Sequence, residues 1–131
     1  MAKLVGHQGR ETVKLYERTD VSGMNTIAKI EDNGKARAYE MITIDEFCEE
    51  NNIVPDVIKI DIEGAEVMAL SGGRRILRQY SPVIFLSVHP RQIATLGHSN
   101  SELRNRVDEL DYEEWDVKQN KPCHGVLGFG E

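Results

Sequence analysis

The stretch VIKIDIEGAE, residues 57–66, sets an apolar run directly against a group of acids. Val57 to Ile60 reads as a short buried strand, because its side chains are mostly aliphatic. Asp61, Glu63 and Glu66 follow at once, and a buried carboxylate is unfavourable unless it is paired. In an open α/β sheet, however, ligands bind beyond the carboxyl ends of the strands. Placing the acids at that rim keeps them solvated and removes the conflict.

Upstream of this stretch the sequence predicts strands and one hairpin. Residues 11–16 alternate in a way that is typical of a strand, and residues 17–26 read as a loop. Asn33-Gly34 lies between two runs of β-forming residues, and this dipeptide is the strongest short-range hairpin signal. We therefore expect Ile27–Ile30 and Ala38–Ile44 to be antiparallel partners or neighbours.

Two capping-box matches mark the starts of helices. Thr43 with Glu46, and Ser99 with Glu102, each place a hydroxyl side chain three residues before a glutamate. In this motif each side chain satisfies a backbone amide of the first helical turn. We expect a helix after each match, the first of them over about residues 45–51.

Between these two matches the chain predicts two helices and a second buried strand. Residues 64–71 have apolar positions on nearly every side, which predicts a well-covered helix that Gly72-Gly73 ends with a left-handed position. Residues 74–80 form another short helix. The run VIFLSV, residues 83–88, is continuously apolar. That pattern predicts a strand of a parallel sheet that helices cover on both faces.

The C-terminal region predicts two late strands, over residues 112–118 and 125–129, with the turn at Asn120-Lys121-Pro122. The order of elements is that of an α/β protein with parallel strands in the middle and an antiparallel pair at the end. A length of 131 residues fits a single domain over residues 1–131. The glycine-rich segments 70–75 and 125–130 lack the strand–loop–helix context of a nucleotide-binding turn, so we interpret both as structural.

Composition limits the classes of partner and the location. The net charge is −6, and the basic residues form no block larger than the pair Arg74-Arg75, so a nucleic-acid partner is not expected. Cys48 and Cys123 lie far apart and form neither a zinc motif nor a disulfide framework. No apolar run approaches the roughly 18 residues of a membrane span, and the start is not a signal peptide. The cytoplasm is the expected location.

His89 completes a candidate site with the acids after the first buried strand. It follows the predicted strand 83–88, as Asp61 and Glu63 follow residues 57–60. Since neighbouring parallel strands end at the same edge of a sheet, the three side chains should lie within reach of one another. They are suitable ligands for magnesium, manganese or iron, although nothing in their spacing requires a metal.

Each of these residues also has a structural interpretation. Asp61 could cap the helix that begins near Gly64, because a carboxylate there accepts backbone amides. Glu66 falls in the first turn of that helix, where an acid is favourable anyway. Gly64 would let the chain turn tightly from strand to helix. His89 could be an ordinary histidine at the end of a strand.

Three segments together resemble a known family. TIDEF (43–47), PDVIKIDIEGAEVMALSGG (55–73) and SPVIFLSVHP (81–90) resemble the FkbM family of S-adenosylmethionine-dependent methyltransferases. The resemblance implies a class I methyltransferase fold, which is Rossmann-like. Such a fold has a mostly parallel sheet with helices on both faces and a C-terminal antiparallel hairpin. It also implies transfer of a methyl group from S-adenosylmethionine to a hydroxyl oxygen of a small molecule or sugar.

The resemblance carries the family's acidic signature onto Asp61, Glu63, Gly64 and Glu66. It implies that Asp61 and Gly64 contact the cofactor, and that Glu63, Glu66 and His89 contact the acceptor. Asp61, His89 and Glu63 are then the catalytic candidates. His89 or Asp61 would take the proton of the acceptor hydroxyl, and Glu63 would orient the acceptor or bind a metal.

The family's glycine-rich turn and its ribose-binding carboxylate would precede Leu4. We therefore expect this chain to correspond to the C-terminal part of the domain and to bind the cofactor weakly by itself. A parallel sheet cut through its middle exposes an edge and an apolar face, so we expect self-association or a partner chain that covers that edge. The rival hypotheses are a non-catalytic α/β interaction module and a metal- or phosphate-binding domain.

Overall fold

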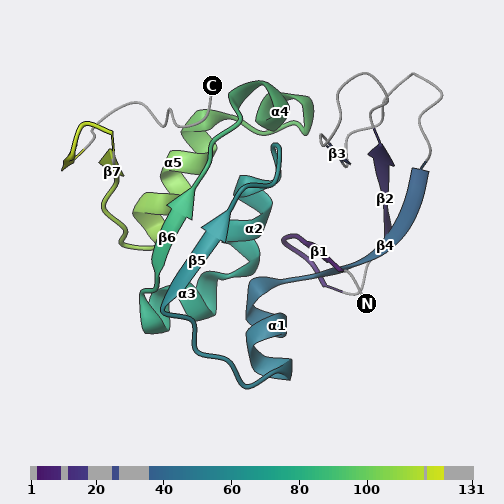
Figure 1. Ribbon diagram of the computed structural model, residues 1–131, viewed down its shortest axis with the longest axis horizontal. Helices are drawn as coiled ribbons and strands as arrows, with labels where there is room; N and C mark the ends of the chain where they lie inside the picture. The colour runs from purple at the N-terminus through teal and green to yellow at the C-terminus, as the bar shows by residue number, and fades with distance from the viewer. Residues whose placement is uncertain (1–2, 10–11, 18–24, 27–35, 117, 123–131) are drawn as a thin grey trace.

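The computed structural model describes residues 3–9, 12–17, 25–26, 36–116 and 118–122 (Figure 1). The elements are β1 (Leu4–Val5), β2 (Thr12–Glu17), β3 (Asn25–Thr26), β4 (Ala36–Ile42), α1 (Ile44–Glu50), β5 (Val57–Ile60), α2 (Glu66–Gly72), α3 (Arg74–Tyr80), β6 (Val83–Leu86), α4 (Pro90–Thr95), α5 (Asn100–Glu109), β7 (Trp115–Asp116) and β8 (Lys121–Pro122). The mixed α/β class is therefore confirmed.

The described strands form three sheets instead of the one mostly parallel sheet that we expected. The first sheet has the order β1-β4-β2-β3, the second is β5-β6, and the third is β7-β8. The first is mixed, because β4 runs parallel to β1 and antiparallel to β2. Parallel pairing also joins β5 to β6, with Val57 opposite Val83 and Ile60 opposite Leu86.

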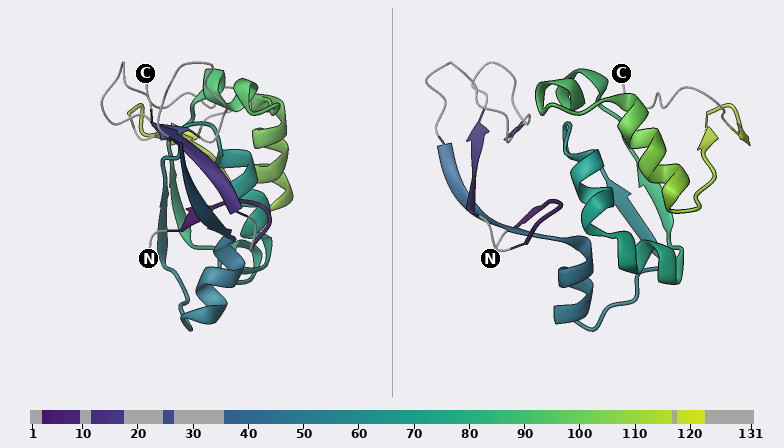
Figure 2. Two further views of the ribbon diagram at one scale, coloured as in Figure 1. Left: turned by 90° about the vertical axis from the view of Figure 1, so that its right-hand side faces the viewer. Right: turned by 180° about the vertical axis from the view of Figure 1, so that it is seen from behind.

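The described helices cover one face of the β5–β6 sheet, not both. Seen from behind, α2, α3 and α5 lie in front of these two strands, whose other face they leave uncovered (Figure 2). Because side chains alternate along a strand, Ile58 and Ile84 pack against the core, whereas Val57, Val83 and Phe85 are 53–57% exposed. The continuous apolar run of β6 therefore does not mark a strand covered on both faces.

The core lies between these helices and the inner face of β5–β6. Leu70 of α2, Leu77 of α3, Ile93 of α4 and Leu103 of α5 are completely or almost completely buried. Full burial of one such side chain stabilises the fold by about 1.5–3 kcal/mol. These contacts fix α2 and α4 beside the carboxyl ends of the two strands.

Both capping boxes are confirmed. Thr43 and Ser99 are the N-caps of α1 and α5, and each accepts a hydrogen bond from the backbone amide of the glutamate three residues later. Helix α4 follows His89 directly, with Pro90 at its first turn, where a missing amide is harmless. No helix was predicted there, because the segment is short and has no capping box.

Gly72-Gly73 separates α2 from α3, as expected, but not through a left-handed residue. Gly73 has a φ of −110°. The pair is needed for close packing instead. A Cβ on Gly72 would collide with the carbonyl oxygen of Gly6, and one on Gly73 would lie 3.2 Å from Cβ of Ile44. The two glycines therefore let the end of α2 approach β1 and α1.

The turn predicted at residues 120–122 is wrong in part, because Lys121-Pro122 form β8 and pair with Trp115-Asp116 of β7. The hairpin at Asn33-Gly34, the strand over residues 125–129 and Cys123 lie outside the described residues. Among the described strands, β4 has β2 as its antiparallel partner. None of the described helices is long and apolar enough to span a membrane.

Candidate active site

The carboxyl ends of β5 and β6 bring four polar side chains together. The amide of Ser87 donates a hydrogen bond to the carbonyl of Ile60 at 2.9 Å, so the two strands end side by side. His89 Nε2 lies 3.4 Å from Asp61 Oδ1 and 3.4 Å from Glu63 Oε1. Its Nδ1 lies 2.6 Å from Glu66 Oε1. The predicted juxtaposition is confirmed, while the roles of these residues stay predictions.

Glu66 is the buried anchor of the cluster. Its side chain has no exposed surface, although it is a carboxylate in the first turn of α2. Oε1 accepts hydrogen bonds from His89 Nδ1 and from the backbone amide of Gly64 at 3.2 Å. A buried acid of this kind persists only where partners compensate its desolvation. Glu66 reaches the exposed part of the cluster through its contact with His89, and its expected contact with an acceptor stays a prediction.

Two residues of the loop between β5 and α2 have a backbone conformation that side chains rarely adopt. Glu63 has a φ of 51° and Gly64 a φ of 107°. At Gly64 a Cβ would be strained by this φ and would lie 2.6 Å from the carbonyl carbon of Gln92 in α4. The interpretation of Gly64 as a tight-turn glycine is confirmed. Its contact with a cofactor stays a prediction.

Two of the structural alternatives are wrong. The N-cap of α2 is Ala65, and no side chain caps that helix, so Asp61 does not serve as a cap. His89 is not an ordinary histidine at the end of a strand, because its side chain is only 13% exposed and contacts three carboxylates. With these two structural roles excluded, the feature that Asp61 and His89 share is their contact with each other beyond the ends of β5 and β6.

The electrostatics of His89 follow from these contacts. Burial of the ring disfavours the imidazolium and lowers its pKa. The hydrogen bond to Glu66, together with the charges of Glu63, Glu66 and Asp61, outweighs burial and raises the pKa of His89 above its ordinary value. A carboxylate only accepts hydrogen bonds, so Nδ1 is the donor to Glu66, and Nε2 is the nitrogen presented to Asp61 and Glu63.

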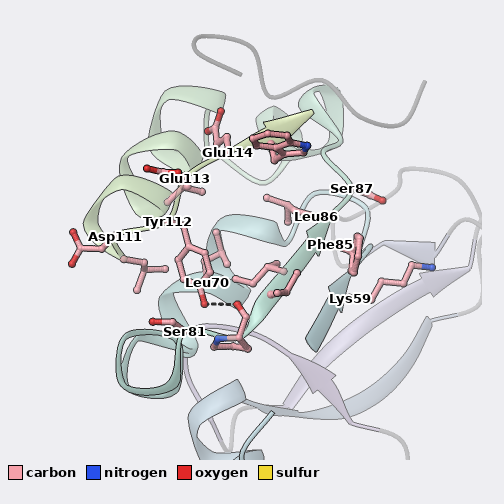
Figure 3. Close-up of a pocket in the computed structure, with 16 residues that line it drawn as sticks. Lys59, Leu70, Ser81, Phe85, Leu86, Ser87, Asp111, Tyr112, Glu113 and Glu114 are labelled. Carbon is pink, nitrogen blue, oxygen red and sulfur yellow. Dashed lines mark hydrogen bonds between the residues drawn. The ribbon is translucent and has the colours of Figure 1, made fainter. Parts of the chain in front are cut away.

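A cavity of about 770 Å³ lies beside β6 but is separate from this cluster. It runs between β6 and residues 111–115, and neither His89 nor the three acids line it. Figure 3 shows Phe85, Leu86 and Tyr112 around it, with the Tyr112 hydroxyl donating to the carbonyl oxygen of Pro82 at 2.8 Å. No motif in the sequence marks this cavity, because its walls are mostly ordinary apolar residues, with polar side chains such as Lys59 and Glu113 among them.

The chain belongs to the FkbM family of methyltransferases. The family model described as the Methyltransferase FkbM domain matches residues 2–114, which confirms the resemblance noted in the sequence. The match covers the acid-rich loop, His89 and all the described helices. Comparison with curated proteins gives no match, and comparison with solved structures gives none either.

Proposed function

We propose that this chain takes part in S-adenosylmethionine-dependent methyl transfer to a hydroxyl oxygen of a small molecule or sugar. Family membership supports the methyl transfer. The observation that carries the proposal for the site is the placement of His89 between buried Glu66 and the more exposed Asp61 and Glu63. These residues follow two parallel strands, where ligands bind in α/β sheets. A class I arrangement of strands forms part of the same proposal.

The residues at the strand ends fit the cofactor in part. The Asp61 side chain is 44% exposed, so its carboxylate is free to accept hydrogen bonds from the cofactor's hydroxyl or amino groups. The amide of Gly64 already donates to Glu66, so Gly64 offers close approach of its backbone and not a free donor. When bound, S-adenosylmethionine supplies a methyl group that is already activated on a sulfonium sulfur.

The chain's own residues then hold the acceptor hydroxyl and remove its proton. His89 and Asp61 are the candidate proton acceptors, because Nε2 and the Asp61 carboxylate lie together at the open edge. In the neutral ring the proton is on Nδ1, which donates it in the hydrogen bond to Glu66, so the lone pair that can accept a proton is on Nε2. Glu63, 26% exposed, is placed to orient the acceptor.

Methyl transfer from labelled S-adenosylmethionine to a panel of sugar and small-molecule hydroxyls tests the proposal. We expect Asp61→Ala and His89→Ala to lower the rate by about 10²–10⁴-fold where the residue is the base. His98→Ala is the matched control, because His98 forms a surface pair with Glu102 at 3.3 Å. Undiminished activity in both single variants and the double variant would remove Asp61 and His89 from the mechanism.

A second candidate function is a non-catalytic interaction module that associates with a second copy of itself. The open face of β5–β6 favours it, since Val57, Val83 and Phe85 are more than half exposed there. Lys59 and Glu113 line the cavity at this face, and their opposite charges can pair across a twofold axis. Light scattering on the wild type and on Phe85→Lys separates the outcomes. A dimer that the substitution abolishes supports the module, and a monomeric wild type excludes it.

A further inference from the structure

We propose that Asp61, Glu63 and His89 bind a divalent transition-metal ion, and that Glu66 positions His89 for this role. Each of the three ligand residues offers one atom, and the three atoms lie within 4.8 Å of one another. The donor set is two carboxylate oxygens and one imidazole nitrogen, which suits ions such as Mn²⁺, Fe²⁺ and Zn²⁺.

The spacing of the ligand atoms supports the assignment. His89 Nε2 lies 3.4 Å from Asp61 Oδ1 and 3.4 Å from Glu63 Oε1. An ion that binds its ligands at about 2.1 Å keeps neighbouring ligand atoms about 3.0 Å apart in an octahedral site and about 3.4 Å apart in a tetrahedral one, and the two distances from Nε2 agree with the latter. Three protein ligands of this kind leave a further coordination position for water or for a hydroxyl, as in catalytic metal centres.

The charges at the cluster favour a bound cation. Nδ1 of His89 donates to Glu66, so a neutral ring turns the lone pair of Nε2 toward two carboxylates that can only accept. This arrangement is repulsive until a proton or a metal ion lies between them. With a neutral ring the three carboxylates leave the cluster with a formal charge of −3, which a divalent ion bound at Nε2 would reduce to −1.

Two buried atoms give independent support. Oε2 of Glu63 and Oε2 of Glu66 are buried and have no hydrogen-bond partner among the described residues. Buried acceptors of this kind are rare in folded proteins, and a bound ion is one of the partners that can satisfy them. The Glu66–His89 contact also has the form of the carboxylate–histidine pairs that fix ligand orientation in metal centres.

The inference deepens the proposed function, because it assigns Nε2 of His89 to the ion instead of to the hydroxyl proton. A bound ion would lower the pKa of a coordinated hydroxyl. The binding test uses neither methyl donor nor acceptor, so metal binding and methyl transfer can fail separately.

Titration with Mn²⁺, followed by the electron paramagnetic resonance signal of the free ion, tests the site. Mn²⁺ is the probe because it avoids cysteine thiols. We expect one site per chain, weakened at least about tenfold by Asp61→Asn and by Glu63→Gln. Both substitutions keep the shape of partly exposed side chains, so the fold should persist, and circular dichroism checks that it does. His98→Ala should leave the affinity unchanged.

Three results would overturn the proposal. One is the absence of Mn²⁺ binding at millimolar concentrations. Another is wild-type affinity in Asp61→Asn and Glu63→Gln, which would place the ion elsewhere on the chain. The third is an equal loss of affinity in His98→Ala, which would show general surface binding.

Discussion

The polar groups at the two ends of β6 differ in how completely they are hydrogen-bonded. At the amino end, the Tyr112 hydroxyl donates to the carbonyl of Pro82 at 2.8 Å. At the carboxyl end, His89 contacts Asp61, Glu63 and Glu66, and two carboxylate oxygens of this cluster remain buried without a hydrogen-bond partner among the described residues. Both ends are partly buried, so burial by itself does not explain the difference.

A satisfied buried polar group stabilises a fold, whereas an unsatisfied one is retained at the expense of stability. We therefore interpret the hydrogen bond of Tyr112 as a stabilising contact and the His89 cluster as a functional site. The backbone does not distinguish the two ends, since Glu63 and Gly64 have positive φ angles at the His89 end and Ser81 and Asp111 have them at the Tyr112 end.

The largest effect on stability should come from Gly64→Ala. A Cβ there would be strained by the φ of 107° and would press on the backbone of Gln92, which cannot move away as a side chain can. We expect a loss of about 3 kcal/mol from the free energy of unfolding. Urea denaturation followed by circular dichroism measures it.

Gly97→Ala is the matched control for this prediction. Gly97 also has a positive φ, 81°, but nothing lies within 4 Å of its Cβ position. Only the backbone penalty of about 1 kcal/mol should remain. Equal losses in the two variants would mean that the close approach of α4 at Gly64 contributes nothing.

Glu66→Ala should have the next largest effect. It removes the partner of His89 Nδ1 and of the Gly64 amide, and breaking a buried pair commonly destabilises by about 3–5 kcal/mol. His89 keeps Asp61 and Glu63 as partners, so we expect about 2–3 kcal/mol. Glu66→Gln retains an acceptor for the amide and should lose about 1 kcal/mol.

The same chemical denaturation should show a loss of about 1 kcal/mol or less in Glu102→Ala. Glu102 also pairs with a histidine and closes the capping box of α5, but on the surface. If Glu66→Ala were as mild as Glu102→Ala, then burial would not distinguish the His89 cluster from a surface pair.

The sequence predicted the His89 cluster better than the shape of the sheet. Strand ends, helix starts and the acid-rich loop depend on local patterns, and Val57–Ile60, Thr43 and Ser99 lie where those patterns place them. The burial of Glu66 could not be predicted from a local sequence pattern. A glutamate in a first helical turn is normally solvated, and Glu66 is compensated by the Gly64 amide and by His89, which lies 23 residues later in the sequence.

The open face of β5–β6 was misread for a related reason. A continuous apolar run reports hydrophobic side chains on both faces of a strand, but not what covers them. In β6 the inward residues Ile84 and Leu86 pack against the core, while Val83 and Phe85 do not. Coverage depends on segments far away in sequence, which periodicity within one strand cannot specify.

The smallest effect should come from the other end of β6. Tyr112→Phe removes one hydrogen bond to the Pro82 carbonyl and leaves the ring in place, so we expect a loss of about 1 kcal/mol at neutral pH. Burial raises the pKa of Tyr112 above its ordinary value. The stability that this shift contributes is fully present below the unfolded pKa of about 10 and is lost as the pH rises through the folded pKa. The difference in unfolding free energy between wild type and Tyr112→Phe should therefore shrink above pH 10 in urea titrations, since the wild type alone must lose this proton. A difference that stays constant across that range would mean that the hydroxyl is solvated. Tyr112 would then not be a buried, hydrogen-bonded group, and the contrast between the two ends of β6 would fail.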